Sequence, residues 1–240
     1  MSDAIVIIPT FNEIENIESI IRAVFSQEKS FHILVVDDNS PDKTAECVGR
    51  LQTEFPDSLF ILNRTKKAGL GVAYLDGFKW TLAKSYSYIF EMDADFSHNP
   101  DDLIKLYDAC ENGKADIAVG SRYVRGITVV NWPLPRILLS YGASRYVRFI
   151  TGMKVKDSTA GFICYKRDVL EAINLSKVRF VGYAFQIEMK FKAFKKGFKI
   201  IEIPVIFKDR VKGKSKMSGS IISEAIFGVI SLKLKSLFSR

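Results

Sequence analysis

The stretch Tyr88-Ile-Phe-Glu-Met-Asp-Ala-Asp95 joins a short apolar strand to two carboxylates, Asp93 and Asp95. Residues 88–92 predict a buried strand, and side chains two positions apart on a strand point to the same side. Both carboxylates could therefore reach one cation from the carboxyl edge of the strand. Hard cations such as Mg²⁺ take carboxylate oxygens and share their remaining positions with water and substrate phosphates. An acidic pair of this kind also suits a solvated turn, so its meaning depends on the rest of the chain.

Strands and helices alternate on both sides of this stretch. Apolar runs predict strands over residues 4–9, 31–36, 59–62, 88–92 and 117–120. Helical spacing predicts helices over 12–25 and 43–54, one after the loop 66–71, and one beginning at 99–102. This alternation is typical of an α/β fold with a mostly parallel, Rossmann-like sheet flanked by helices. Ligands of such sheets bind beyond the carboxyl ends of the strands.

Polar residues gather where these predicted strands end. They occupy positions 10–13, 37–38, 66–71 and 93–95. Each group taken alone suits an ordinary turn, whereas several acidic turns on one edge of a sheet favour a ligand site. Gly69 and Gly71 suit either a tight loop near a nucleotide or a plain turn.

Composition limits the classes of protein that the chain can represent. Its 240 residues, 48% of them hydrophobic, suffice for one substantial α/β domain. The formal net charge of +8 suits nucleic acid, an anionic membrane or phosphorylated substrates. Cys47, Cys110 and Cys164 lack metal-ligand spacing and are predicted to be reduced thiols of a cytosolic protein. We predict no signal peptide, and no membrane span, because no uncharged apolar run reaches roughly 18 to 20 residues.

The second half of the chain has a different charge pattern. Residues 117–156 contain no aspartate or glutamate, and aromatic residues lie among their arginines. This segregation favours an anionic partner with an apolar part. Residues 129–149 read as an amphipathic element, either a path for a lipid phosphate or a flap over the sheet edge. The apolar spacing of 221–238 suits packing on the domain or a place in a bilayer interface.

Taken together, these segments resemble the family 2 glycosyltransferases with a GT-A fold, and among them the dolichol- or polyprenol-phosphate mannose synthases. The resemblance spans nearly the whole chain, and its last three motifs are the most specific to the polyprenol-phosphate sugar synthases. The motifs are Pro9-Thr-Phe-Asn-Glu13, Val35-Val-Asp-Asp-Asn-Ser-Pro-Asp42, Lys67-Ala-Gly-Leu-Gly71, Met92-Asp-Ala-Asp-Phe-Ser-His-Asn-Pro100, Gly120-Ser-Arg-Tyr123, Asp157-Ser-Thr-Ala-Gly-Phe162, Gly182-Tyr-Ala-Phe-Gln-Ile-Glu188 and Asp209-Arg-Val-Lys-Gly-Lys-Ser-Lys-Met217.

The resemblance implies roles for individual residues. Asp93 and Asp95 would hold Mg²⁺ or Mn²⁺; some members add a glutamine two positions later, where this chain has Ser97. Asp95, Arg122 and Arg210 would be catalytic, and Arg122, Arg136 and Ser140 would bind the acceptor phosphate. The implied donor-binding residues are Pro9, Phe11, Glu13, Val36, Asp38, Asp93, Ala94, Asp95, Arg122, Arg210 and Lys216.

The reaction that the resemblance implies is mannosyl transfer from GDP-mannose to a polyprenyl or dolichyl phosphate, with inversion and metal assistance. The products would be polyprenyl phosphate mannose and GDP. A phosphate monoester is already ionised near pH 7, so this acceptor needs no general base. His98 is read as a residue at a helix entry or behind the site rather than as a catalytic group.

Three alternatives remain at this point. The first is a polyprenyl-phosphate glucose synthase that uses UDP-glucose. The second is a family 2 enzyme acting on a hydroxyl acceptor, which needs a carboxylate base near residues 182–188, with Glu188 as the candidate. The third is a nucleic-acid-binding protein; we predict no such partner, because acidic strand ends repel a phosphate backbone.

We expect a catalytic domain over residues 1–217 and an amphipathic C-terminal helix over 218–240 that suits a membrane interface. The enzyme would be cytoplasmic and peripheral, at the cytoplasmic face of the membrane. Its partners would be GDP-mannose, the polyprenyl phosphate and the membrane surface. Whether it also needs a membrane-anchoring protein is left open by the sequence.

Overall fold

The computed structural model describes residues 2–182, 184–209 and 228–236. Its strands are β1 (Ala4–Thr10), β2 (His32–Asp37), β3 (Leu59–Asn63), β4 (Tyr88–Glu91), β5 (Ile117–Ser121), β6 (Val129–Val130), β7 (Ile163–Lys166), β8 (Ile200–Pro204) and β9 (Phe207–Lys208). Its helices are α1 (Ile17–Phe25), α2 (Thr44–Glu54), α3 (Leu70–Leu82), α4 (Asp102–Glu111), α5 (Leu134–Thr151), α6 (Arg167–Ala172) and α7 (Ala184–Lys195), with a 3₁₀ turn, η1 (Leu175–Lys177).

The described strands form a seven-stranded sheet in the order β3-β2-β1-β4-β7-β5-β8 and a two-stranded sheet of β6 and β9. All pairs in the large sheet are parallel except those of β7, which runs antiparallel to both β4 and β5. An antiparallel strand begins at the edge where its parallel neighbours end. The loop before β7 therefore reaches the carboxyl edge of β4 and β5.

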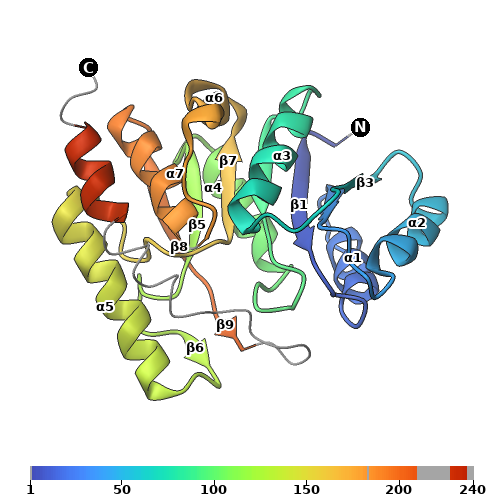
Figure 1. The fold of residues 1–240 in the computed structure, drawn as a ribbon, viewed down its shortest axis with the longest axis horizontal. Coiled ribbons are helices and arrows are strands. Elements are labelled where there is room, and N and C mark those ends of the chain that lie inside the picture. The colour runs from blue at the N-terminus through green and yellow to red at the C-terminus, as the bar shows by residue number, and fades with distance from the viewer. Residues whose placement is uncertain (1, 183, 210–227, 237–240) are drawn as a thin grey trace.

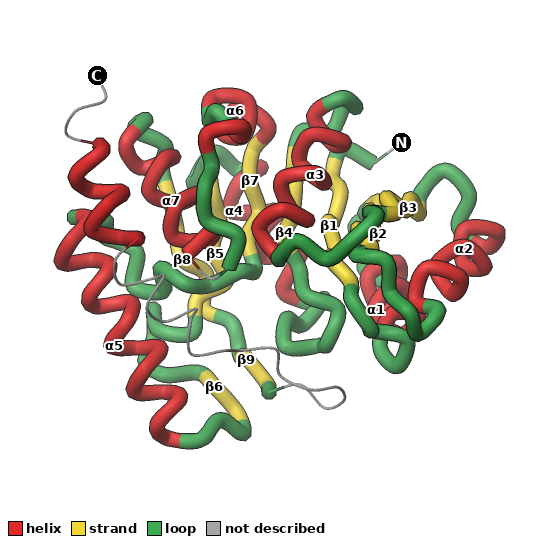
Figure 2. The backbone as a smooth tube through the Cα atoms, viewed as in Figure 1, coloured by secondary structure: helices red, strands yellow, loops and turns green. Residues whose placement is uncertain are grey.

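Helices cover both faces of the large sheet (Figure 1). The alternation of side chains along β1 shows why: Ala4, Val6 and Ile8 face α1, α2 and α4, whereas Ile5 and Ile7 face α3 and α7. Both faces of each central strand are thus buried, as expected for a parallel sheet between two helical layers. The tube view shows the same three layers (Figure 2).

Several predicted boundaries were wrong by a residue or more, and two of them bear on the site. Helix α1 begins at Ile17 rather than at residue 12, because Asn12 has a positive φ of 57° and the Glu13 carbonyl accepts the N–H groups of Asn16 and Ile17 in a turn. Strand β4 ends at Glu91 rather than at Met92. Asp93 and Asp95 therefore lie in the turn after the strand, so the alternation of side chains along a strand does not explain why they come together.

Helix α5 lies at one end of the molecule, beside the small β6–β9 sheet (Figure 1). Residues 228–236 are also helical, and Val229 is buried against Val147 of α5 and Phe191 of α7. None of the helices described is long and apolar enough to cross a membrane. The division into residues 1–217 and 218–240 stays a prediction, because 210–227 and 237–240 lie outside the described residues.

Candidate active site

A cavity of about 500 Å³ opens at the carboxyl edge of β4 and β5. It brings together Asp93 and Asp95 from the turn after β4, Arg122 from the end of β5, and Arg136 and Ser140 from α5. Sequence reasoning had placed all five at the site. The resemblance places Arg136 and Ser140 in the loop that follows Gly120-Ser-Arg-Tyr123, whereas the structure places them on helix α5. The cavity is thus lined by the two aspartates on one side of the site and by the two arginines on the other.

The turn that carries the two aspartates is held by its own polar contacts. The Asp93 N–H donates to His98 Nδ1 at 3.0 Å, and the Ser97 N–H donates to Asp95 Oδ1 at 3.1 Å. Phe96 between them has a positive φ of 60°. Burial lowers the pKa of His98 to about 4, so its ring is neutral near pH 7 and can accept that bond. His98 therefore positions Asp93, in agreement with the sequence interpretation.

The donor atoms of this turn suit a hard divalent cation. Asp93 and Asp95 offer carboxylate oxygens, which Mg²⁺ and Mn²⁺ prefer, and such ions commonly complete their shell with phosphate oxygens and water. Ser97 also lines the cavity, and its buried hydroxyl has no hydrogen-bond partner among the described residues. No group of three or more His, Cys, Asp or Glu side chains forms a metal site in the part of the chain described. Two protein carboxylates would leave most positions to substrate.

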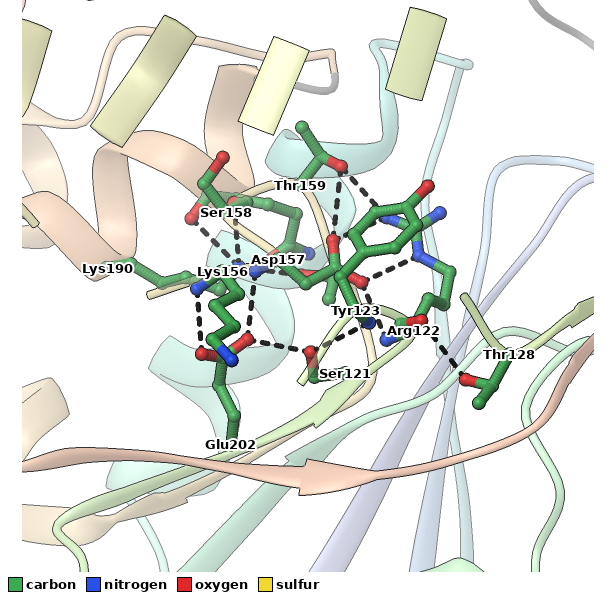
Figure 3. A network of polar contacts seen from close by, with 12 residues as sticks. Ser121, Arg122, Tyr123, Thr128, Lys156, Asp157, Ser158, Thr159, Lys190 and Glu202 are labelled. Atoms are coloured by element: carbon green, nitrogen blue, oxygen red, sulfur yellow. Dashed lines mark hydrogen bonds and ion pairs between the residues drawn. The ribbon is translucent and has the colours of Figure 1, made fainter. Parts of the chain in front are cut away.

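Arg122 is clamped from the loop before β7 (Figure 3). Its Nε and Nη2 atoms donate to the two carboxylate oxygens of Asp157 at 2.7 and 2.6 Å, and Nη2 also donates to Thr159 Oγ1 at 2.9 Å. The ion pair is almost fully buried on both sides. The guanidinium further lies 5.2–5.4 Å from the ring centres of Tyr123, Trp132 and Phe207. Such a bidentate, ring-enclosed guanidinium has one well-defined orientation.

Behind this clamp, the buried Lys190 and the half-buried Glu202 hold the loop 157–161. The Lys190 ammonium donates to the carbonyls of Ser158, Ala160 and Gln186, at 3.2, 2.6 and 3.2 Å. Glu202 accepts the N–H groups of Lys156 and Asp157 and the Ser121 hydroxyl. Burial lowers the pKa of Lys190 to about 8. The loop that orients Arg122 is therefore itself fixed from β8 and α7 (Figure 3).

The basic wall continues on α5. Arg136 donates to Asp209 at 2.9 Å, and its guanidinium lies 3.9 Å from the centre of the Trp132 ring. Ser140 lies one helical turn further along α5 and also lines the cavity. Arg210 and Lys216, which were predicted for the same region, lie outside the described residues.

The predicted nucleotide residues lie along the same sheet edge, on β1 and β2. Pro9 and Val36 are register partners of the two strands. The Lys67 ammonium lies 4.3 Å from the centre of the Phe11 ring, and the Glu13 N–H donates to Thr44. Asp38 forms a buried ion pair with Arg64 at 2.5 Å, although burial still raises its pKa. These residues line the edge next to the 500 Å³ cavity and not the cavity itself, as suits a nucleotide that extends from the metal site.

Gly71, which was predicted to lie in a loop, lies in the first turn of α3 and has a packing role there. A Cβ atom there would lie 2.8 Å from the Phe180 carbonyl oxygen and from the Phe185 ring. Its N–H donates to the Val181 carbonyl. Gly69 has a positive φ of 104° and also contacts Val181. The pair thus permits close approach of the segment before α7.

Comparison with known proteins now decides the family. Residues 5–173 match the family described as glycosyl transferase family 2.

The chain belongs to glycosyl transferase family 2.

Two characterised relatives are similar over nearly the whole chain. The chain is 48% identical over 236 residues to the polyprenol monophosphomannose synthase of Mycolicibacterium smegmatis, covering 98% of this chain and 89% of the relative. It is 42% identical over 223 residues to the undecaprenyl-phosphate mannosyltransferase of Micrococcus luteus, covering 93% and 90%. A mannosyltransferase of Pyrobaculum calidifontis, solved with GDP-Man and Mn²⁺, has a TM-score of 0.61 at 16% identity over 98% of this chain and 74% of its own. The predicted family and α/β fold are confirmed.

Members of glycosyl transferase family 2 that act on a hydroxyl acceptor need a general base, so the side chains of α7 near the cavity bear on the type of acceptor. Glu188, the candidate base for a hydroxyl acceptor, does not line the cavity. It accepts the N–H groups of Arg179 and Phe180 and pairs with Lys192 at 3.0 Å. The α7 side chain that lines the cavity is Gln186. A carboxamide cannot remove a proton as a base does.

Sequence reasoning had assigned no role to Asp157, Gln186 or Lys190. The first two belong to motifs that carried the family 2 resemblance. Those motifs were the available signal, but nothing in them shows that Asp157 reaches Arg122, 35 positions earlier.

Proposed function

We propose that this chain transfers a mannosyl group from GDP-mannose to the phosphate of a polyprenyl phosphate, giving polyprenyl phosphate mannose and GDP. The observation that carries the proposal is the makeup of the cavity. Arginines and a serine face a pair of aspartates, and a carboxamide stands where a hydroxyl acceptor would require a base. The names of the two relatives, similar over more than nine-tenths of this chain, support the lipid-phosphate acceptor and the mannosyl group.

The donor half of the reaction depends on the acidic turn. Asp93 and Asp95 would hold Mg²⁺ or Mn²⁺, which when bound supplies Lewis-acid stabilisation of the diphosphate leaving group. The Ser97 N–H and His98 keep the two carboxylates in place. Arg210 and Lys216 are proposed to add positive charge at the same diphosphate, since cations aimed at developing charge are a large catalytic term.

The acceptor half depends on the arginines. A phosphate monoester is an anion near pH 7, so its oxygen attacks without losing a proton, and the difficulty is to bring it up to the anionic donor. Guanidinium groups bind phosphate oxygens bidentately. Arg136 and Ser140 would therefore hold the acceptor phosphate, with Arg122 between acceptor and donor. A single in-line displacement on this geometry inverts the configuration at the sugar.

Replacing Glu188 with Gln should leave the turnover number within about threefold of wild type. Its carboxylate accepts two backbone N–H groups and is not the base of the reaction. Loss of a general base typically costs a factor of about 10²–10⁴. Initial rates at saturating donor and acceptor between pH 6 and 9 would test this. Lys192→Met, which removes the ion-pair partner of Glu188, is the matched control. A fall beyond a hundredfold in Glu188→Gln alone would restore the hydroxyl-acceptor hypothesis.

We further propose that the enzyme works as a peripheral protein at the cytoplasmic face of the membrane. Helix α5 supports this, because one outward stripe combines exposed apolar residues with arginines: Leu134, Leu138, Tyr141, Arg145, Arg148 and Phe149. Phe149 is 87% exposed. Leu138 also lines the cavity, so the stripe leads from the surface to the site. The three unpaired cysteines suit the reducing cytoplasmic side.

Reversing the charge of Arg145 or Arg148 should weaken binding to anionic vesicles about tenfold for each substitution. A cation near an anionic bilayer contributes about 1 kcal/mol, and reversal replaces attraction by repulsion. Co-sedimentation with vesicles containing anionic phospholipid measures the effect at fixed salt. Arg50→Glu, an exposed arginine of α2 at the far end of the sheet, is the control. Equal losses in all three variants would indicate a response to net charge and contradict docking through α5.

Product formation from radiolabelled GDP-mannose and a short polyprenyl phosphate, in detergent with Mg²⁺ or Mn²⁺, tests the proposed function. UDP-glucose runs in parallel. Metal-dependent label in the lipid phase from GDP-mannose supports the proposal. Label from UDP-glucose alone changes the sugar. A protein that binds nucleotide and metal but forms no lipid product from either donor contradicts the lipid-phosphate acceptor.

A further inference from the structure

Gln186 is a polar side chain of the cavity wall whose hydrogen bonding is incomplete on one side. It is 3% exposed, projects from the first turn of α7 and lines the cavity with the two aspartates. Its Nε2 donates to Glu91 Oε2. Its Oε1 is buried and accepts no hydrogen bond from any residue in the described ranges. Buried carbonyl oxygens are almost always paired, so an acceptor of this kind in a cavity wall indicates a donor on the ligand.

Glu91 orients this carboxamide in the structure, because Nε2 donates to Glu91 Oε2 and Oε1 lies on the other side of the group. Glu91 is itself fully buried at the end of β4, two residues before Asp93. The Lys190 ammonium holds the main chain of Gln186 at 3.2 Å. The contacts to Glu91 and Lys190 therefore leave Oε1 as the atom of the residue that is available to a ligand.

Gly161 leaves room above the carboxamide. A Cβ atom at that position would lie 3.4 Å from Gln186 Nε2 and 3.8 Å from Cδ. A side chain longer than that of alanine would therefore crowd the Gln186 carboxamide. Gly161 and Gln186 both line the cavity, so the bare main chain at 161 keeps the carboxamide within reach of a ligand.

The chemistry of the reacting groups identifies the donor. Near neutral pH the diphosphate and the acceptor phosphate present oxygens that mainly accept hydrogen bonds. Between them lies the transferred sugar, whose hydroxyls donate. Asp93 and Asp95 are committed to the metal site in the proposed function, and Asp209 accepts from Arg136. Gln186 Oε1 thus offers a neutral acceptor in the same cavity as Arg122 and Arg136.

We infer that Gln186 recognises the transferred sugar, with Oε1 accepting a hydrogen bond from one of its hydroxyls and Glu91 setting the carboxamide orientation. This inference rests on the proposed function, because it takes the sugar to lie between the aspartates and the α5 arginines. It makes Gln186 a specificity-determining residue for the hexose.

A cycle of deoxy-sugar donors and Gln186 variants tests this directly. Wild type is first assayed with GDP-mannose and UDP-glucose, and the 2-, 3-, 4- and 6-deoxy analogues of the donor it uses are then compared. We expect wild-type kcat/KM to fall about 10- to 100-fold for one analogue, because losing the hydroxyl leaves a buried acceptor unpaired. In Gln186→Met, the same analogue and the parent sugar should differ by less than about threefold. A purely structural role would lower both donors equally.

Two further variants make the result decisive. Gln52→Met removes a half-buried glutamine of α2 that is remote from the cavity, and should keep the full wild-type discrimination. Gln186→Asn keeps a carboxamide but withdraws it by one methylene, so it should also lose discrimination. This variant provides the test if Gln186→Met does not fold. Unchanged discrimination in folded Gln186 variants overturns the inference while leaving the proposed function in place. A wild-type chain that uses neither donor overturns both.

Discussion

Replacing Asp95 with Asn is expected to reduce kcat/KM for lipid mannosylation about 10³-fold. The substitution keeps the shape of the turn, since the Asn oxygen can still accept the Ser97 N–H that Asp95 receives at 3.1 Å. It removes one of two carboxylates that would hold the cation, and removal of one group stabilising transition-state charge typically costs about 10²–10³. The loss of metal affinity adds to this. Rates measured over a range of Mn²⁺ and Mg²⁺ concentrations separate the two contributions.

Asp101→Asn provides the matched control for Asp95→Asn. Asp101 lies six positions further along, is exposed, and accepts a hydrogen bond from Gln27. It makes the same change of charge outside the cavity, so its activity and metal dependence should match wild type. Wild-type metal dependence in Asp95→Asn would show that the cation is held elsewhere and would contradict the assignment of the acidic turn.

Replacing Asp157 with Asn is expected to lower the free energy of unfolding by about 3–5 kcal/mol. Arg122 is 8% exposed and Asp157 is 0% exposed, so the substitution leaves a buried guanidinium without its counter-charge. Removal of one partner from a buried ion pair typically has that cost. Urea-induced unfolding followed by circular dichroism measures it. Activity should fall as well, because the guanidinium would lose the two-point contact that fixes its orientation.

Glu171→Gln separates the effect of burial from that of losing an ion pair. Glu171 pairs with Arg167 at 2.6 Å, but its side chain is 49% exposed. An exposed pair contributes about 0–1 kcal/mol, so this variant should unfold close to wild type. Equal destabilisation by the two substitutions would mean that burial does not increase the contribution of the Arg122–Asp157 pair to the free energy of unfolding.

Much of the fold and part of the site followed from local sequence. Apolar runs located the first five strands because most of them are buried on both faces, as the 0% exposure of Ile5, Val6 and Ile7 in β1 illustrates. The edge strand β3 is half-buried but still apolar. Asp93 and Asp95 come directly after such a run. Their place at the carboxyl edge of the sheet could therefore be predicted. The start of α1 was wrong because a turn at residues 13–17 carries the same apolar spacing as a helix.

The missing part of the site depends on contacts distant in sequence. Asp157 binds Arg122 across 35 positions, and Gln186 reaches Glu91 across 95. No rule of sequence spacing connects such residues. They meet because β7 runs antiparallel and because α7 lies beside the cavity. Glu188 was a candidate base for a reason of the same kind. Its position in the sequence did not reveal that it accepts two N–H groups from the preceding loop.

The antiparallel strand also bears on how the protein is made. Strand β7 is inserted between β4 and β5, although it follows both in the chain. Until residues 163–166 leave the ribosome, β4 has an unpaired edge and β5 has no partner linking it to the first half of the sheet. Unpaired edges are sites of misassociation, and distant pairings form slowly. Completion of the active site is therefore a late event of synthesis, and any chain that ends before β7 lacks both the link between its halves and the strand that anchors the loop holding Arg122.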